Sequence, residues 1–138
     1  MVDSNEEKST SKHILIVDDD ITCLDIVSFV FQQSGYSVDR CASGETAVEY
    51  VHNVIPDLIL IDLLMPGIDG LTTIRTIRNL GIDKVPIIAF TAVDDEDLDQ
   101  AVREVGCELV LKKPCPLSML ISAITGALTP RVLTTGHP

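Results

Sequence analysis

The sequence predicts an α/β fold in which five parallel strands form one sheet and helices cover both of its faces. Two observations predict this doubly wound architecture. Between residues 13 and 128, short apolar segments alternate five times with segments whose apolar residues recur at helical spacing, a pattern typical of strand–helix units in a parallel sheet. The apolar runs at 13–18 and 57–62 are continuous, as expected of strands that are covered on both faces.

The first two strand–helix units span residues 13–53. The run HILIVD (13–18) predicts a buried strand, and YSVDR (36–40) predicts a second, weaker one. A helix is expected over 21–34, because apolar residues recur along one side and Gly35 can end it; its inner residues are expected to be Ile21, Leu24, Val27 and Phe31. Ser43 can cap a second helix that runs to about Asn53.

The remaining three units follow the same pattern. DLILID (57–62), PIIAFT (86–91) and CELVLK (107–112) predict the third, fourth and fifth strands. Apolar residues at helical spacing predict three further helices, over 69–80, around 98–105 and over 117–128, with Gly81 and Gly106 as stops for the first two. We therefore expect one domain over 13–128, a polar extension over 1–12 and a tail over 129–138.

Composition excludes several classes of function. The 138 residues carry a formal net charge of −11, so phosphate backbones and anionic membranes would repel the chain, and we expect it to bind neither nucleic acid nor membrane. No apolar run approaches the length that a membrane span requires, and residues 1–12 hold no apolar signal-peptide core. A cytoplasmic protein is expected.

Several common sites are also absent from the sequence. The four cysteines have no metal-binding spacing, and a domain of this size does not need disulfides, so all four are expected to be reduced and mostly in the core. The three histidines are dispersed along the chain, and neither of the two glycine-rich nucleotide-binding motifs occurs. Metal centres based on histidine or cysteine therefore have little support.

Polar residues follow four of the predicted strands: Asp18-Asp19-Asp20, Asp62, Thr91 and Lys112-Lys113-Pro114. The carboxyl ends of parallel strands meet at one edge of the sheet, where sites of this fold class occur. Carboxylates gathered there would repel one another unless a proton, a metal or another cation neutralised them. Oxygen ligands suit Mg²⁺, and a hydroxyl and an ammonium suit phosphate oxygens. The residues therefore indicate a site for a phosphoryl group and a divalent ion.

The same segments resemble the receiver domain of two-component response regulators. ILIVDDD, LIDLLMPGIDG, AFTA and LKKP occur in the family's order, and the pattern D-x-x-M-P-x-x-D-G with an upstream acidic pair and a downstream Thr and Lys-Pro is very specific. The resemblance covers residues 13–128. It implies a flavodoxin-like (βα)5 fold with strand order 2-1-3-4-5, and a phosphorylatable signalling switch whose chemistry is limited to its own phosphorylation and dephosphorylation.

The resemblance also implies a role for individual residues. Asp62 matches the phosphoacceptor, a carboxylate nucleophile. Asp18 and Asp19 match the acidic pair that holds Mg²⁺ together with Asp62, and Leu64 would add its backbone carbonyl. The expected partners are a sensor histidine kinase or a histidine phosphotransfer protein. A downstream protein would contact the face formed by the last two helices and the strand between them.

Other family positions match as well. Thr91 would supply the hydroxyl that follows the phosphoryl group, Ala92 a backbone N–H, and Lys113 the ammonium that pairs with phosphate. The loop residues after Asp62 are expected to be structural, with Gly70 easing a turn. The family's Lys-Pro bond, here Lys113–Pro114, is often cis.

Some residues allow two interpretations. Asp20 directly precedes a helix and is interpreted as its cap rather than as a metal ligand. Lys112 is interpreted as a solvated neighbour of Lys113. The acidic run from Asp94 to Asp99 is interpreted as the first turn of a helix rather than a second metal site. Asp18-x-Asp20-x-Thr22 also matches the opening motif of haloacid-dehalogenase phosphatases. That alternative, with Asp18 as nucleophile, leaves the loop after Asp62 unexplained.

The chain departs from the family on its output side. Receivers commonly carry Tyr or Phe three residues before the functional lysine, and often Phe after Lys-Pro. Val110 and Cys115 stand at these positions. Because valine is stiff and too short to replace a ring, we expect the loop from Ala92 to Asp95 and the helix after it to carry the output.

Overall fold

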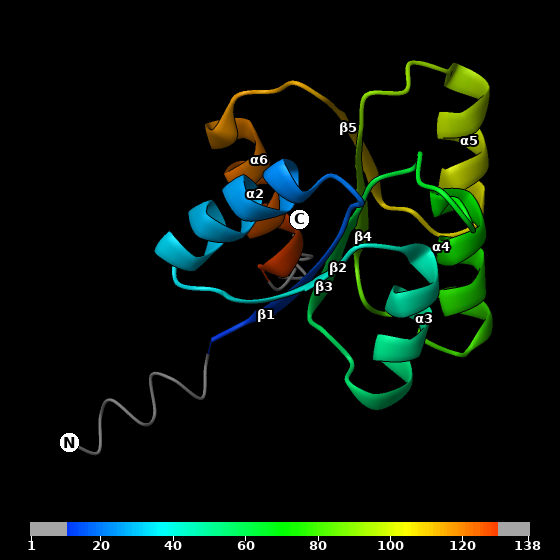
Figure 1. Cartoon of the computed structure of the whole chain (residues 1–138), viewed down its shortest axis with the longest axis horizontal. Coiled ribbons are helices and arrows are strands. Elements are labelled where there is room, and N and C mark those ends of the chain that lie inside the picture. The colour runs from blue at the N-terminus through cyan, green and yellow to red at the C-terminus, as the bar shows by residue number, and fades with distance from the viewer. Residues whose placement is uncertain (1–10, 130–138) are drawn as a thin grey trace, which may run out of the picture.

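The computed structural model describes residues 11–129 and contains all five predicted strand–helix units (Figure 1). The strands are β1 (His13–Val17), β2 (Ser37–Cys41), β3 (Leu58–Ile61), β4 (Ile87–Thr91) and β5 (Leu109–Lys112). The helices are α2 (Ile21–Gln33), α3 (Gly44–Asn53), α4 (Gly70–Asn79), α5 (Glu96–Glu104) and α6 (Leu117–Leu128). Nearly all of the predicted extension (1–12) and tail (129–138) lies outside the described residues.

The strands form one parallel sheet in the order β2-β1-β3-β4-β5. Helices α2 and α6 lie on one face of the sheet, and α3, α4 and α5 lie on the other (Figure 1). The doubly wound fold and its strand order are thereby confirmed. The chain leaves β1 toward one face and β3 toward the other, so the strand order reverses between them and opens a crevice at their carboxyl ends.

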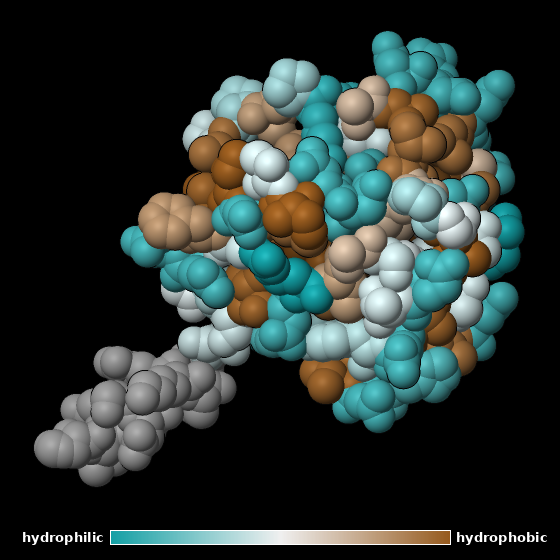
Figure 2. Space-filling model, in the orientation of Figure 1, coloured by the Kyte–Doolittle hydropathy of each residue, from teal (hydrophilic) through white to brown (hydrophobic). Residues whose placement is uncertain are grey.

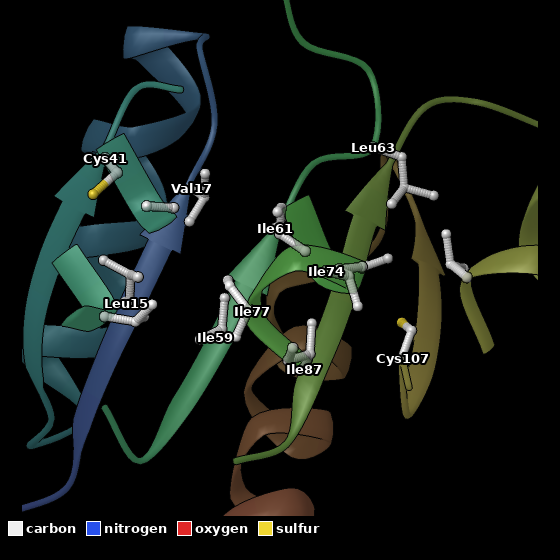
Figure 3. Close-up of a cluster of buried hydrophobic side chains, with 14 of the residues drawn as sticks. Leu15, Val17, Cys41, Ile59, Ile61, Leu63, Ile74, Ile77, Ile87 and Cys107 are labelled. Atoms are coloured by element: carbon white, nitrogen blue, oxygen red, sulfur yellow. The ribbon is translucent and has the colours of Figure 1, made fainter. Parts of the chain in front are cut away.

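The two faces of the sheet carry separate cores, because successive strand residues point to opposite sides. Figure 3 shows part of the core that packs against α3, α4 and α5, to which β1 contributes Leu15 and Val17, and β3 contributes Ile59 and Ile61. The alternate residues of the same strands, such as Ile16 and Leu60, pack against α2 and α6. Burial on both faces explains why the central strands are continuously apolar.

Within residues 11–129, most helix ends lie at residues that local chemistry favours, although α6 begins without a side-chain cap. Asp20 and Ser43 cap α2 and α3, as predicted, and the side chains of Asp69 and Asp95 cap α4 and α5. In each case a side-chain oxygen accepts hydrogen bonds from backbone N–H groups of the first turn. Positive φ angles follow three helices, at Gly35, Gly81 and Gly106. These glycines end their helices as predicted, since only glycine adopts this conformation without strain.

One sequence prediction about the fold, the burial of Ile21, is wrong. Ile21 is 56% exposed, because at 3.6 residues per turn it lies roughly 80° around the helix from the stripe of Leu24, Val27 and Phe31 that packs on the sheet. The four cysteines are free, as predicted; Cys41 and Cys107 are buried in the core, and Cys23 and Cys115 are partly buried and pack against it. Among residues 11–129, no helix combines the length and the hydrophobicity that crossing a bilayer requires.

Candidate functional site

The predicted site residues meet at the carboxyl edge of the sheet. Asp18 follows β1 directly and Asp62 follows β3, and the last residues of these strands, Val17 and Ile61, are register partners. Thr91 ends β4 opposite Lys112 of β5, and Lys113 follows. The backbone continues this register, since the Asp62 N–H donates to the Val17 carbonyl at 2.9 Å and the Lys113 N–H to the Thr91 carbonyl at 2.8 Å. Strand pairing therefore positions every one of these side chains.

Lys113 joins the ends of the first and third strands. Its ammonium donates to Asp18 Oδ2 at 2.7 Å and to Asp62 Oδ2 at 3.3 Å. Burial by itself would lower the pKa of Lys113, but its hydrogen bond to Asp18 and the negative charges of Asp62 and Asp18 together raise the pKa above its usual range. The site therefore holds a lysine that stays charged between two carboxylates, and Lys113 rather than Lys112 is the lysine that faces them.

Three carboxylates form a cluster that fits a divalent cation. One oxygen each from Asp18, Asp19 and Asp62 lies within 4.8 Å of the others; Asp18 is buried and Asp19 is exposed. Carboxylate oxygens at this spacing, with one side open to water, suit Mg²⁺, which binds few protein ligands and keeps several waters. Leu64, the expected source of a carbonyl ligand, donates its N–H to Asp62 Oδ1 at 3.3 Å.

The loop after Asp62 is fixed by close packing. Gly67 has a positive φ of 80°, and the next N–H, that of Ile68, donates to the Glu45 carboxylate of α3. A Cβ on Gly70 would lie 2.6 Å from the Leu63 Cα and 2.7 Å from the Asp62 carbonyl oxygen. Gly70 is therefore needed for the close approach of α4 to this loop. The predicted role in easing a turn is wrong, since its φ is not positive.

Thr91 is buried, and its hydroxyl accepts a hydrogen bond from the Val93 N–H at 3.2 Å. A cavity opens between the loop that follows β4 and the residues that follow β3. It is lined by Asp62, Leu64, Thr91, Ala92 and Val93. Because Asp62 and Thr91 line the same cavity, a group bound there could contact both side chains.

Two neighbours of the site were not singled out as such from the sequence. Phe90 lies under Lys113, whose ammonium is 5.4 Å from the ring centroid. Cys23, in the first turn of α2, lies beside Asp18; burial and the carboxylate raise the pKa of its thiol to about 12, so it stays protonated. The position of Cys23 near the site could have been inferred from the sequence, because it lies in the first turn of the helix that Asp20 caps, directly after the acidic run.

The lysine next to the site has partners of its own. Lys112 donates to the Val93 carbonyl at 2.7 Å and to Asp99 of α5 at 2.9 Å. The prediction that Lys112 is a solvated neighbour is therefore wrong. The acidic run from Asp94 to Asp99 does form the cap and first turn of a helix, as predicted, but its Asp99 also pairs with this lysine.

Comparisons with known proteins support one family. The family model described as the response regulator receiver domain matches residues 14–125. The chain belongs to that family.

Named relatives agree with this assignment. The alkaline phosphatase synthesis transcriptional regulatory protein SphR of Synechococcus elongatus is 35% identical over 115 residues, which cover 77% of this chain and 44% of that protein. Response regulator MprA of a Mycobacterium species is 33% identical, over 83% of this chain and 50% of MprA. The chain thus spans about half the length of these relatives.

A solved structure agrees on the fold. The putative response regulator from Chloroflexus aurantiacus superposes with a TM-score of 0.81 at 34% identity, covering 86% of this chain and 98% of that one. The receiver domain described here is a module of two-component signalling. Asp20, the second aspartate of the phosphatase-like motif Asp18-x-Asp20-x-Thr22, caps α2. This role favours the receiver interpretation over the phosphatase alternative.

Val110 and Cys115 occupy the two positions at which the family usually carries aromatic residues. Val110 is half-buried on β5 and packs against the core shared with α3, α4 and α5. Cys115, after the cis Lys113–Pro114 bond, lines an apolar groove between α2 and the start of α6. Figure 2 shows hydrophobic residues among the side chains over α2, in the left part of the view. The exposed large hydrophobic residues of α2 include Ile26 and Phe29.

Proposed function

We propose that this receiver domain accepts a phosphoryl group on Asp62 from a phosphohistidine of a sensor kinase or a histidine phosphotransfer protein. In the transfer, an oxygen of Asp62 forms the new bond to phosphorus, while the nitrogen–phosphorus bond breaks and its electron pair stays on the imidazole. The single observation that carries the proposal is the Lys113 ammonium between Asp18 and Asp62 within a cluster of three carboxylates.

Each neighbour of Asp62 has a task that its position supports. Lys113 can exchange its contact with the Asp62 carboxylate for one with the new phosphoryl oxygens, because its ammonium already lies 3.3 Å from Asp62 Oδ2. Thr91 shares the cavity with Asp62, and its hydroxyl proton is available to a phosphoryl oxygen because the oxygen accepts from Val93. These groups stabilise charge and orient the acceptor, which is most of what phosphoryl transfer asks of a protein.

We infer that Asp18, Asp19 and Asp62 hold Mg²⁺, with the Leu64 carbonyl as a further ligand. When bound, the ion neutralises negative charge on the phosphoryl oxygens. Support comes from the donor set, which contains only oxygen ligands and has an open side at Asp19. Among the residues that the structure describes, Lys113 supplies the ammonium that pairs with carboxylates of this cluster of three, which leaves an excess of negative charge there.

We propose residues 13–128 as the receiver unit and the face of α5, β5 and α6 as its output surface toward a protein partner. The family match over 14–125 supports the bounds. Exposed apolar residues support the surface, because β5 is an edge strand with Leu109 at 36% exposure and α6 presents Leu117 and Met119 at 44% and 50%.

Phosphorylation with acetyl phosphate and Mg²⁺ tests the proposal. Intact-mass measurement should show one added phosphoryl group in the native chain and none in Asp62→Asn. Asp83→Asn, a change at an exposed loop aspartate, is the matched control and should gain the group normally. An undiminished mass gain in Asp62→Asn would contradict the proposal. If Asp18→Asn alone abolished a covalent adduct that mapped to residue 18, the phosphatase alternative would be favoured instead.

A further inference from the structure

Two consecutive lysines leave β5 toward different partners. Successive residues of a strand point to opposite faces, and Lys112 lies on the face covered by α5, while Lys113 reaches the acidic cluster. The Lys112 side chain is 38% exposed and its partner Asp99 only 17%. The Lys112 side chain is therefore held by hydrogen bonds to α5 and to the loop that precedes α5.

The loop after β4 is held at one residue, Val93, through both its N–H and its carbonyl group. The N–H of Val93 donates to the Thr91 hydroxyl at 3.2 Å, and the carbonyl of Val93 accepts from the Lys112 ammonium at 2.7 Å. Thr91 and Lys112 are also register partners across β4 and β5. The ammonium thus connects strand β5, helix α5 and the residue that bonds to the Thr91 hydroxyl.

This connection matters for any movement of Thr91. If the Thr91 side chain turns toward a group on Asp62, its bond to the Val93 N–H must lengthen or the loop must follow. The second course requires the Val93 carbonyl to leave Lys112, and a hydrogen bond to a charged group is among the stronger ones in proteins. The contact of Lys112 therefore opposes movement of the loop.

We propose that Lys112 is a positioning residue that holds the loop from Ala92 to Asp95 in its unphosphorylated arrangement through the Val93 carbonyl and Asp99. This proposal rests on the proposed phosphorylation of Asp62. Lys112 touches neither the phosphoryl group nor the metal ligands; it acts through Val93 on Thr91. With no ring at Val110 to respond to Thr91, this contact adds a second link between the site and α5, beside the connecting loop itself.

The test compares the affinity of the full chain for beryllofluoride, a phosphoryl mimic, in the presence of Mg²⁺. Lys112→Met keeps the apolar stem and removes the charge, so it should bind beryllofluoride about tenfold more tightly, the effect of losing one charge-assisted hydrogen bond. Asp99→Asn should act in the same direction, and the double variant should show less than the sum of the two effects. Lys84→Met, at an exposed loop lysine, is the control and should match the native chain.

Two further readouts separate positioning from mere stability. Without beryllofluoride, backbone amides of 92–95 should exchange faster with solvent in Lys112→Met, while amides of β1 and β3 should not. Lys112→Arg, which keeps the charge and the donors, should restore the native affinity. If Lys112 only stabilised the fold, Lys112→Met would lower the urea midpoint of unfolding and leave the beryllofluoride affinity unchanged.

The outcomes distinguish this proposal from the proposed function. Unchanged or weaker beryllofluoride binding by Lys112→Met, when the native chain binds, overturns the role of Lys112 and leaves the phosphorylation of Asp62 intact. Failure of the native chain to bind beryllofluoride with Mg²⁺ overturns the proposed function, and the role of Lys112 falls with it.

Discussion

Replacing Lys113 by methionine tests how the charges of the acidic cluster are balanced. The change keeps most of the side-chain volume and removes the only ammonium in contact with Asp18 and Asp62 among the described residues. Asp18 and Asp62 would then remain near each other with side-chain exposures of only 4% and 11%. Without a metal ion, we expect the variant to be markedly less stable than the native chain.

The size of the effect follows from the distances. At an effective dielectric of about 20, the contacts of 2.7 and 3.3 Å correspond to gross attractions of about 6 and 5 kcal/mol, which desolvation of the three groups offsets in large part. Removing one partner of a buried pair costs about 3–5 kcal/mol. Because the Lys113 side chain is 20% exposed, we expect the lower end, about 3 kcal/mol.

The assay is urea unfolding in EDTA and again with saturating Mg²⁺. In EDTA, Lys113→Met should lose about 3 kcal/mol in the free energy of unfolding, or roughly 10 °C in Tm for a domain of this size. The difference should shrink with Mg²⁺, because a divalent ion replaces the missing positive charge. Lys84→Met is the control for loss of a surface lysine.

A second change checks the electrostatic origin of the loss. Adding Asp62→Asn to Lys113→Met removes one of the two unpaired carboxylates and should recover part of the stability in EDTA. The reasoning is refuted if Lys113→Met is as stable as the native chain in EDTA, or if Mg²⁺ stabilises both chains equally.

Three further predictions concern the metal, the loop and the output. Mg²⁺ at a hundred times its Kd should stabilise the native chain by ~2.7 kcal/mol, and Asp19→Ala should abolish most of that gain; a Tm of the native chain that ignores Mg²⁺ would count against the site. Gly70→Ala should cost about 1–3 kcal/mol in urea unfolding because its Cβ would overlap backbone atoms, whereas Gly126→Ala, with no atom within 4 Å, should not destabilise the protein. Val110→Tyr should leave the rate of phosphorylation by acetyl phosphate nearly unchanged while altering partner binding; structures of the free and beryllofluoride-bound native chain contradict the underlying idea if 92–105 stays in place and only Val110 changes its rotamer.

Local chemistry in the sequence was enough to predict the elements of the fold. The buried strands are apolar runs, whereas the edge strand β2 reads SVDRC and gave the weaker signal. Helix ends carry signals of one or two residues, such as the cap Ser43 and the stop Gly35. These signals work because capping and positive φ depend on adjacent backbone atoms alone. The position of Ile21 was predicted wrongly, because a residue at the border of a helical stripe is buried or exposed according to how the helix packs.

The gathering of the site residues was predictable for a topological reason. Parallel strands bring their carboxyl ends to one edge, so Asp18 and Asp62 could be placed together before any distance was known. The hydrogen bond of Lys113 to Asp18 joins residues 95 apart in sequence. It was not predicted, because the family motif indicated only that Lys113 pairs with phosphate. The phosphoacceptor role of Asp62 stays a prediction until the adduct is measured.

The sequence by itself determined the strand–helix alternation, the helix ends and the set of polar residues at the edge of the sheet, because each depends on a few consecutive residues and on the direction of parallel strands. Only the tertiary structure decided what Lys112 and Gly70 do. Lys112 meets Val93 and Asp99 because α5 packs beside β5, and Gly70 is required because α4 approaches the backbone of Leu63. Such contacts depend on how separate elements pack in space, which no short stretch of sequence specifies.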